Sequence, residues 1–339
     1  MAKIKFALVG CGFIGQVHAA NLAAHPATAL TLTADIDEAR ARQLAQRYGS
    51  RTATVEQAIR HEEIDAVLIA SATPSHAALL EAAARAGKAV WCEKPIDLSL
   101  ARAQQTVERI LPLKAPVTVG FNRRFDQSHR QLKRQLAAGA IGQPELIQMV
   151  CRSSEMPSLD YLRASGGQMR DQAIHFFDLL RWLTGDEVTL VGALGATLAQ
   201  PALSELGDVD TSVLIMQLQQ GALAQLDNAR RTGYGYDERI SVMGAAGLAE
   251  SASPLPPGVR LWQGDAQRQP GMWPDWFSRI RATWYDHLDA FVSEIQGVPS
   301  ADLPRLLDGL QAQAIAEAAT LALQTRRFCA VAQLTGGAA

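Results

Sequence analysis

The chain has 339 residues, a hydrophobic content of 48% and a formal net charge of −2. Its length exceeds that of a usual single domain, so we predict two domains with ordinary buried cores. The near-neutral charge excludes a strongly basic protein that binds nucleic acid or anionic membranes. The cysteines form no Cys-x-x-Cys pair, so neither a disulfide framework nor a zinc site is indicated. A strand pattern begins within three residues of the start and no apolar run reaches membrane-spanning length, so we expect a soluble cytoplasmic protein without a signal peptide.

The first motif is a glycine-rich turn between a strand pattern, residues 4–9, and a helical pattern, residues 16–24. This order of strand, turn and helix is typical of a dinucleotide site. Gly10 allows the tight turn, Gly12 lets the backbone approach a pyrophosphate, and Gly15 lets helix and strand pack closely. The free N–H groups and the positive end of the helix dipole then hold the phosphates. We therefore assign to the cofactor Gly10, Gly12, Phe13, Ile14 and Gly15.

An acidic residue follows at the spacing that this motif requires. Asp35 stands 20 residues after Gly15, at the end of a second strand pattern, residues 30–34. There its carboxylate can accept hydrogen bonds from an adenosine ribose and repel the 2′-phosphate of NADP. A lone Gly-x-Gly-x-x-Gly is weak evidence because glycine turns are common. With strand, helix and acid all in place, we predict that the chain binds NAD.

Strand and helix patterns alternate from residue 1 to residue 122, which we predict to be the first domain. Helices are expected over 38–48, 55–60, 75–86 and 100–110, and strands over 66–70, 89–92 and 117–121. Ser75 is the expected N-cap of the third of these helices and Gly87 its stop. The alternation predicts an α/β Rossmann domain with a doubly wound parallel sheet.

Polar residues follow two neighbouring strands of this sheet. Ligands of doubly wound sheets lie beyond the carboxyl ends of the strands. Thr73 and His76 follow one strand, and Glu93-Lys94-Pro95 follows the next. His76 can equally be a solvated residue at a helix start, and Lys94 can be a surface lysine. We predict that the Lys94 ammonium contacts a reacting oxygen of the substrate. We assign four residues to the cofactor site: Thr73, His76, Glu93 and Lys94.

Residues 123–335 are predicted to form a second, α+β domain. Helices are expected over 128–138, 284–295 and 303–324, and strands over 145–151, 188–198, 209–217, 222–228 and 239–243, with a turn at 218–221. Residues 251–275 have a loop-like composition around one short strand, 259–262. Strands joined without intervening helices favour a mostly antiparallel sheet with one open face.

A candidate acid–base pair lies inside this second domain. Asp171 and His175 are four residues apart in a helical pattern that runs to about residue 183, so they share a helix face. A carboxylate beside an imidazole suits a general base near neutral pH, which the oxidation of an alcohol by a nicotinamide requires. Most such pairs are solvated helix faces, and a zinc site would need a third ligand that the spacing does not offer.

Several stretches resemble the glucose-fructose oxidoreductase / inositol dehydrogenase (Gfo/Idh/MocA) family. The similarity spans residues 4 to about 245 and rests on 9–15, Glu93-Lys94-Pro95, 120–126, Ser165-Gly166-Gly167, Asp171 with 175–178, and 227–237. The Asn-x-Arg-Arg and Tyr-Gly-Tyr-Asp elements are similar to those of the inositol dehydrogenases. Arg170 and Trp284 depart from the pattern, since relatives place an apolar residue and a tyrosine there.

This resemblance implies an NAD-linked oxidation of a ring hydroxyl of myo-inositol or a close cyclic polyol. It also implies that Lys94 contacts substrate and nicotinamide, that Asp171 supports the base His175, and that Tyr236 lines the polyol site. Members of the family are commonly homotetramers that pack through the open sheet face. Two alternatives remain open: a dehydrogenase of an aldose or sugar derivative, and a non-catalytic regulator that binds NAD and a sugar. A regulator would not need the base.

Overall fold

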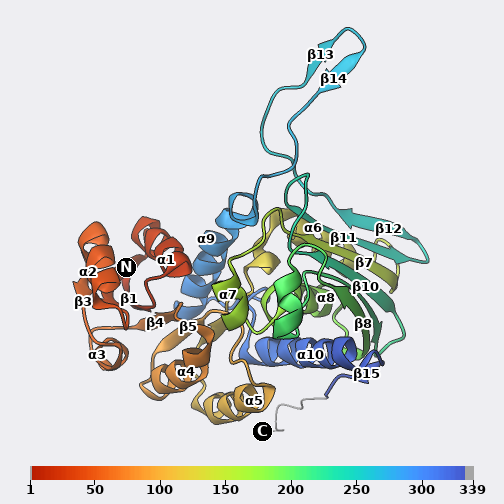
Figure 1. The fold of residues 1–339 in the computed structure, drawn as a ribbon. Helices are drawn as coiled ribbons and strands as arrows, with labels where there is room; N and C mark the ends of the chain where they lie inside the picture. The colour runs from red at the N-terminus through yellow and green to blue at the C-terminus, as the bar shows by residue number, and fades with distance from the viewer. Residues whose placement is uncertain (1, 333–339) are drawn as a thin grey trace. The chain divides into compact units, whose positions relative to one another are not determined.

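The computed structural model describes residues 2–332 (Figure 1). Their contacts form two compact units. The N-terminal unit contains residues 2–125 and 282–313, and the C-terminal unit contains residues 126–281 and 314–332. The domain boundary predicted after residue 122 stays a prediction. By its contacts, the segment 282–313 from the later part of the sequence belongs to the N-terminal unit. In the described part of the chain no helix is long and apolar enough to cross a membrane.

The N-terminal unit is built on a six-stranded parallel sheet with the order β3-β2-β1-β4-β5-β6. Its strands are β1 (Ile4–Val9), β2 (Thr28–Ala34), β3 (Arg51–Thr52), β4 (Ala66–Ile69), β5 (Ala89–Cys92) and β6 (Val117–Val119). Every residue of β4, β5 and β6 is buried, as expected for parallel strands covered on both faces. The prediction of a doubly wound parallel sheet is confirmed.

The helices between these strands are α1 (Phe13–Ala24), α2 (Glu38–Tyr48), α3 (Val55–Arg60), α4 (His76–Arg85) and α5 (Leu100–Ile110). Side chains cap several of them: Asp37 accepts from the first turn of α2, and Thr54 forms a capping box with Gln57 at α3. Ser75 is the N-cap residue of α4, as predicted, but its side chain accepts no hydrogen bond from the helix. Ser75 ends a 3-10 turn, and its hydroxyl donates to Ala72 O at 2.7 Å instead of accepting from α4.

A segment from the C-terminal part of the sequence completes the core of the N-terminal unit. His287, in the second half of α9 (Trp276–Ile295), stacks on Phe125 with ring centroids 4.5 Å apart and lies 3.9 Å from the ring of Trp91. Its Nε2 lies 2.9 Å from the hydroxyl of Thr118 in β6. These contacts join α9 to β5 and β6, which explains why residues 282–313 belong to this unit.

The C-terminal unit contains a seven-stranded sheet with the order β12-β11-β7-β10-β9-β8-β15. Its strands are β7 (Pro144–Arg152), β8 (Val188–Ala196), β9 (Thr211–Leu218), β10 (Leu223–Ala229), β11 (Asp237–Gly244), β12 (Gly247–Ser251) and β15 (Cys329–Ala330). The pair β7 and β10 is parallel and the other pairs are antiparallel. The predicted mostly antiparallel sheet is confirmed, and the strands β12 and β15 are additions to it.

One face of this sheet is covered and the other is open. The helices of the unit are α6 (Gln127–Ala137), α7 (Leu159–Ala164), α8 (Ile174–Thr184) and most of α10 (Leu306–Thr325), and α8 packs against β7. On β9 the side chains alternate, with Leu214 and Met216 buried and Val213 and Ile215 exposed. Alternation of this kind is the pattern of a sheet with one exposed face.

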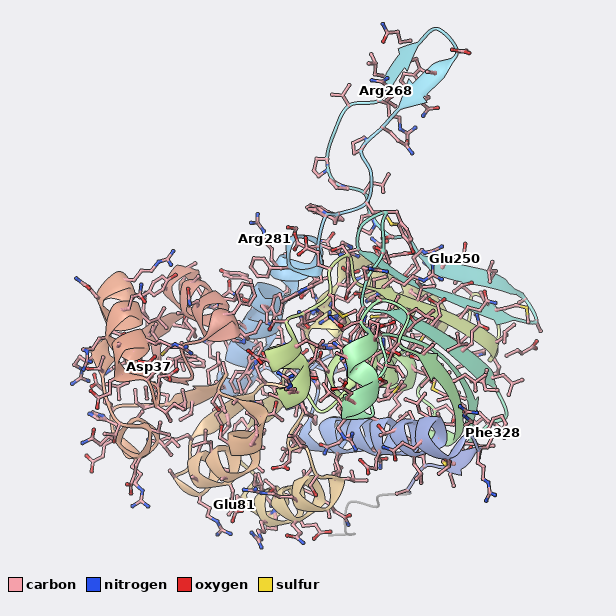
Figure 2. All side chains as sticks on the ribbon, viewed as in Figure 1. Asp37, Glu81, Glu250, Arg268, Arg281 and Phe328 are labelled. Carbon is pink, nitrogen blue, oxygen red and sulfur yellow. The ribbon has the colours of Figure 1, made fainter. Side chains whose placement is uncertain are left out.

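A hairpin extends from the C-terminal unit between β12 and α9. Its two strands, β13 (Leu261–Gln263) and β14 (Ala266–Arg268), pair in antiparallel fashion, and all their residues are exposed. Figure 1 shows the hairpin projecting away from the seven-stranded sheet, and Figure 2 marks Arg268 on it. The sequence predicts one short strand here, and the structure has two.

Candidate active site

The glycine-rich turn between β1 and α1 has no room for side chains at two positions. Gly10 has φ +97°, and a Cβ there would lie 2.4 Å from Ser71 N. A Cβ at Gly15 would lie 2.0 Å from Gly10 O, so this glycine lets α1 start directly on the turn. A Cβ at Gly12 would meet nothing within 4 Å. The backbone at Gly12 is therefore accessible to a ligand, as a pyrophosphate site requires.

The start of α1 also fits a phosphate group. No side chain caps this helix in the described structure, unlike α2, α3 and α5. Its first residue, Phe13, is 58% exposed, and Ile14 is half-buried. Backbone N–H groups at an uncapped helix start favour an anion. The turn and the helix together can hold the pyrophosphate of NAD.

Asp35 is held against the glycine turn by the backbone. Its Oδ2 accepts from Cys11 N at 2.6 Å and its Oδ1 accepts from Asp37 N at 2.8 Å. Ile36, the next residue, is 99% exposed. Burial, followed by the negative charge of Asp35, raises the pKa of the Cys11 thiol to about 12. Cys11 therefore adds no charge to the turn, and Asp35 is the anion placed where a ribose is expected.

His76 links the loops that follow β4 and β5. It is 1% exposed, its Nδ1 lies 2.8 Å from Pro95 O, and its Nε2 lies 2.9 Å from Ser71 O. The alternative of a solvated histidine is therefore wrong. Thr73 is half-buried in the 3-10 turn before α4. The contact between His76 and Pro95 fixes the backbone directly after Lys94, at the carboxyl end of the sheet.

Glu93 is a buried carboxylate beside Lys94. Its Oε1 lies 2.8 Å from His18 Nε2 and accepts from Trp91 Nε1 at 3.3 Å. Burial raises the pKa of this carboxyl, but the hydrogen bond and charge of His18, with a contribution from Lys94, outweigh it, so the pKa is lowered. A Cβ at Gly120 would lie 2.5 Å from Glu93 Oε2. The sequence does not indicate that His18 is the partner of Glu93. Gly120, which leaves room for the Glu93 carboxylate, lies in a stretch that resembles the family.

The second cluster of predicted site residues lies in the C-terminal unit. Residues Met169–Ala173 form a π-helical turn that runs into α8, where the sequence predicts continuous α-helix. Asp171 lies in this turn, and its carboxylate accepts from Tyr161 Oη at 2.7 Å and from Arg230 Nη1 at 3.0 Å. His175 lies in the first turn of α8 and is 6% exposed. Single π turns are rare and are frequent at functional sites.

Two glutamines anchor this turn to the sheet. Gln168 donates from its backbone N to Asp208 Oδ1 at 2.8 Å and from its side chain to Asp210 O at 3.0 Å. Gln172 donates to Ala229 O, at the end of β10, at 3.0 Å. The turn that carries Asp171 is thus fixed to neighbouring strand ends. Nothing in the sequence pattern distinguishes these glutamines from surface residues.

Tyr236 is buried directly before β11. It is 2% exposed, and its hydroxyl donates to the carboxylate of Glu238. The prediction that it lines the polyol site stays a prediction.

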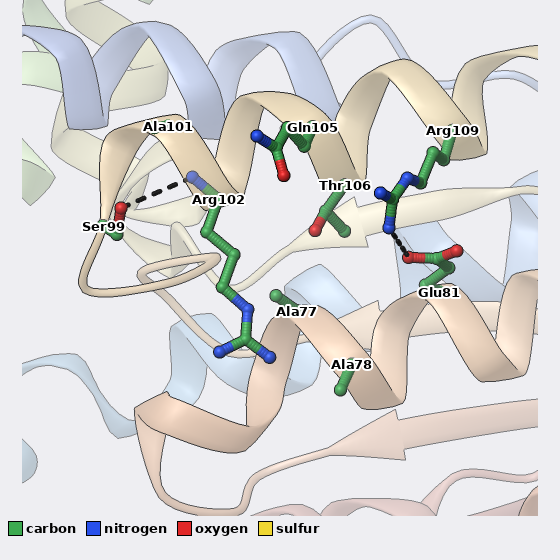
Figure 3. Close-up of a pocket in the computed structure, with 9 residues that line it drawn as sticks. All are labelled: Ala77, Ala78, Glu81, Ser99, Ala101, Arg102, Gln105, Thr106 and Arg109. Carbon is green, nitrogen blue, oxygen red and sulfur yellow. Dashed lines mark hydrogen bonds and ion pairs between the residues drawn. The ribbon is translucent and has the colours of Figure 1, made fainter.

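One surface cavity of the N-terminal unit contains none of the predicted site residues. It has a volume of about 530 Å³ and lies between α4 and α5 (Figure 3). Its Arg109 pairs with Glu81 at 3.3 Å, and its Arg102 lies 3.4 Å from Asp97. The charges of its arginines are therefore compensated by carboxylates. Among residues 2–332, no group of three or more His, Cys, Asp or Glu side chains is placed to hold a metal ion.

The parallel sheet, the glycine turn and the acid at the end of β2 define an oxidoreductase domain of the NAD-binding Rossmann class. Residues 4–121 match the model described as "Oxidoreductase family, NAD-binding Rossmann fold". Residues 129–250 match the "GFO/IDH/MocA C-terminal domain". The chain belongs to the Gfo/Idh/MocA family of oxidoreductases.

Individual relatives extend this likeness over almost the whole chain. An inositol 2-dehydrogenase of Rhizobium meliloti is 36% identical over 97% of this chain and 99% of its own length. A myo-inositol 2-dehydrogenase of Thermotoga maritima is 33% identical over 98% and 100%. The solved structure of a putative myo-inositol dehydrogenase from Sinorhizobium meliloti superposes with a TM-score of 0.92 at 35% identity, covering 97% of this chain and 100% of that one. A scyllo-inositol dehydrogenase from Lactobacillus casei, solved with NAD(H) and scyllo-inositol, gives a TM-score of 0.89 at 28% identity and covers 98% and 100%.

Proposed function

We propose that this protein is an NAD-dependent dehydrogenase that oxidises a ring hydroxyl of myo-inositol, or of a close cyclic polyol, to the ketone. The observation that supports it most is the end-to-end similarity to relatives named inositol 2-dehydrogenase. The reaction requires a base for the hydroxyl proton and a cationic group near the hydroxyl oxygen. The chain has residues for both roles: His175, supported by Asp171, as the base, and Lys94 as the cation.

In the proposed reaction, the carbinol carbon gives a hydride to the nicotinamide of NAD and its hydroxyl gives a proton to His175. The carbon–oxygen double bond forms as the C–H and O–H bonds break. Lys94 stabilises the negative charge that develops on the oxygen, and Asp171 stabilises the imidazolium. The cofactor supplies the hydride acceptor, and the protein supplies orientation, the base and the charge.

A substrate panel tests this proposal. The purified protein with NAD is offered myo-, scyllo- and chiro-inositol and common aldoses, and the absorbance of NADH is followed. We expect the highest kcat/KM with an inositol. A clear preference for an aldose would assign the protein to a sugar dehydrogenase, and NAD binding without turnover on any of them would support the regulator.

Cofactor choice should depend on Asp35. We expect NAD to be strongly preferred over NADP, because the carboxylate accepts from the ribose diol and repels a 2′-phosphate. Asp35→Ser should raise the KM for NAD by about 10- to 100-fold, the scale of one lost charged hydrogen bond. It should also reduce the preference for NAD over NADP. Glu38→Ser, an exposed neighbour, is the control. Equal kcat/KM for NAD and NADP in the wild type would contradict this assignment.

We propose that the protein is a homo-oligomer, a tetramer by family resemblance, that packs through the open sheet face. Strand register places on this face seven exposed apolar side chains: Leu146, Leu194, Val213, Ile215, Leu223, Met243 and Leu248. An exposed apolar patch of this kind supports the proposal, because contact with a second copy would remove it from water.

Introducing two lysines on that face should weaken the oligomer. The double variant Val213→Lys, Ile215→Lys should shift the mass measured by light scattering toward the protomer, because burying unpaired ammonium groups is costly. Gln220→Lys, in the exposed turn after β9, is the control and should keep the wild-type mass. A wild-type protein that is monomeric at all concentrations contradicts the proposal.

A further inference from the structure

Arg230 is a buried arginine that contacts Asp171. It directly follows β10, it is 2% exposed, and its Nη1 donates to Asp171 Oδ2 at 3.0 Å. Its Nη2 lies 3.9 Å from Asp208 Oδ2. Its backbone N donates to Asp210 O at 2.8 Å. The guanidinium is therefore held between two carboxylates, on a backbone that is itself fixed.

Other titratable groups near Asp171 come from three elements. Tyr161, from α7, donates to Asp171 Oδ1, so the two carboxylate oxygens have different partners. Burial, then the charge of Asp171, raises the pKa of the Tyr161 hydroxyl, which keeps it protonated as a donor. Arg170 donates to Gly166 O and pairs with Glu317, and His175 follows in α8. The positive charge of Arg230 is thus shared between the carboxylates of Asp171 and Asp208.

This sharing affects how a neighbouring imidazole titrates. A carboxylate compensated by an arginine stabilises an imidazolium less than a lone carboxylate does. We propose that Arg230 is a positioning residue that sets the protonation of His175 through Asp171, with Asp208 limiting how much of the guanidinium charge reaches Asp171. This inference rests on the proposed function, in which Asp171 supports His175.

Arg230→Met tests the inference, because methionine removes the charge and keeps most of the length. The acid limb of the kcat/KM profile should move to higher pH by about one unit. Activity near neutral pH should then fall several-fold, and part of it should return at higher pH. Arg230→Lys keeps the charge and should leave the limb close to that of the wild type. Arg231→Met, at the exposed neighbouring arginine, is the matched control.

Asp208→Asn should move the limb in the opposite direction. Without the second carboxylate, more of the guanidinium charge compensates Asp171, so the limb should shift to lower pH by less than one unit. A purely structural role predicts equal losses at every pH and no opposite shifts. An unchanged limb in both variants, or shifts of the same sign, would overturn the inference.

A measurement without substrate separates this inference from the proposed function. The protein has seven histidines, and His175→Gln identifies the ring C–H signal of His175 in NMR spectra. Its titration midpoint should rise in Arg230→Met and fall in Asp208→Asn, whether or not any inositol is oxidised. If Arg230→Met does not fold, as checked by thermal melting, the shift in Asp208→Asn decides: a lower midpoint supports the inference, and an unchanged or higher one overturns it.

Discussion

Replacing His175 by alanine should lower kcat by about 10²- to 10⁴-fold at neutral pH, the usual scale for a lost general base. The hydroxyl proton then has no acceptor while the hydride leaves, so the loss falls on the chemical step. The affinity for NAD, measured by calorimetry, should change little, because the glycine turn and Asp35 belong to the N-terminal unit and His175 to the C-terminal unit. Activity of the variant should recover partly at high pH, where hydroxide can accept the proton.

Two variants make this test specific. Asp171→Asn should cause a smaller loss than His175→Ala and should move the acid limb of the pH profile, because the base itself remains. His61→Ala changes a histidine at the end of α3, whose ring accepts only from Glu63 N within the described contacts, and should be close to wild type. Near-normal turnover of His175→Ala at neutral pH would mean that another group accepts the proton.

Local patterns were enough to predict the N-terminal sheet. A buried parallel strand such as Ala66–Ile69 reads as a short apolar run, and Gly10 requires a positive φ, so sequence alone indicates both. The positions of Asp35 and of Lys94 at strand ends follow from the rule for ligands of doubly wound sheets. The structure adds that Asp35 is held by the backbone of the turn.

Contacts between distant residues could not be predicted in this way. Arg230 and Asp171 are 59 residues apart in the chain, and His18 and Glu93 are 75 apart. Such pairs depend on how strands and helices pack, and periodicity carries no information about partners. The π turn around Asp171 is tied to strand ends by hydrogen bonds from the side chains of Gln168 and Gln172, and local periodicity does not indicate these bonds either. Similarly, α9 joins the N-terminal core through His287, a contact that no local pattern indicates.

Replacing Lys94 by methionine should lower kcat by about 10²- to 10³-fold, the scale for removing one donor to a developing oxyanion. The lysine follows β5 at the carboxyl end of the sheet, and its backbone is fixed where His76 contacts Pro95 O. Its charge contributes to the lowered pKa of the buried Glu93 carboxyl beside it, so an anion and a cation stand next to each other at this strand end. An ammonium group is attracted by the alkoxide of the transition state more strongly than by the neutral alcohol, so the loss should appear in kcat more than in the KM for substrate.

Variants at other lysines and a second substitution make the Lys94 result interpretable. Lys94→Arg should also be slow, because a planar guanidinium cannot replace a compact point charge in the same place. Lys3→Met, at an exposed lysine, should match the wild type. Binding of NAD to Lys94→Met, followed by fluorescence, should change little, since the pyrophosphate and ribose are held by the glycine turn and Asp35. If Lys94→Met retains most of its turnover, the developing charge lies elsewhere and the carboxyl end of β5 is not the reaction centre.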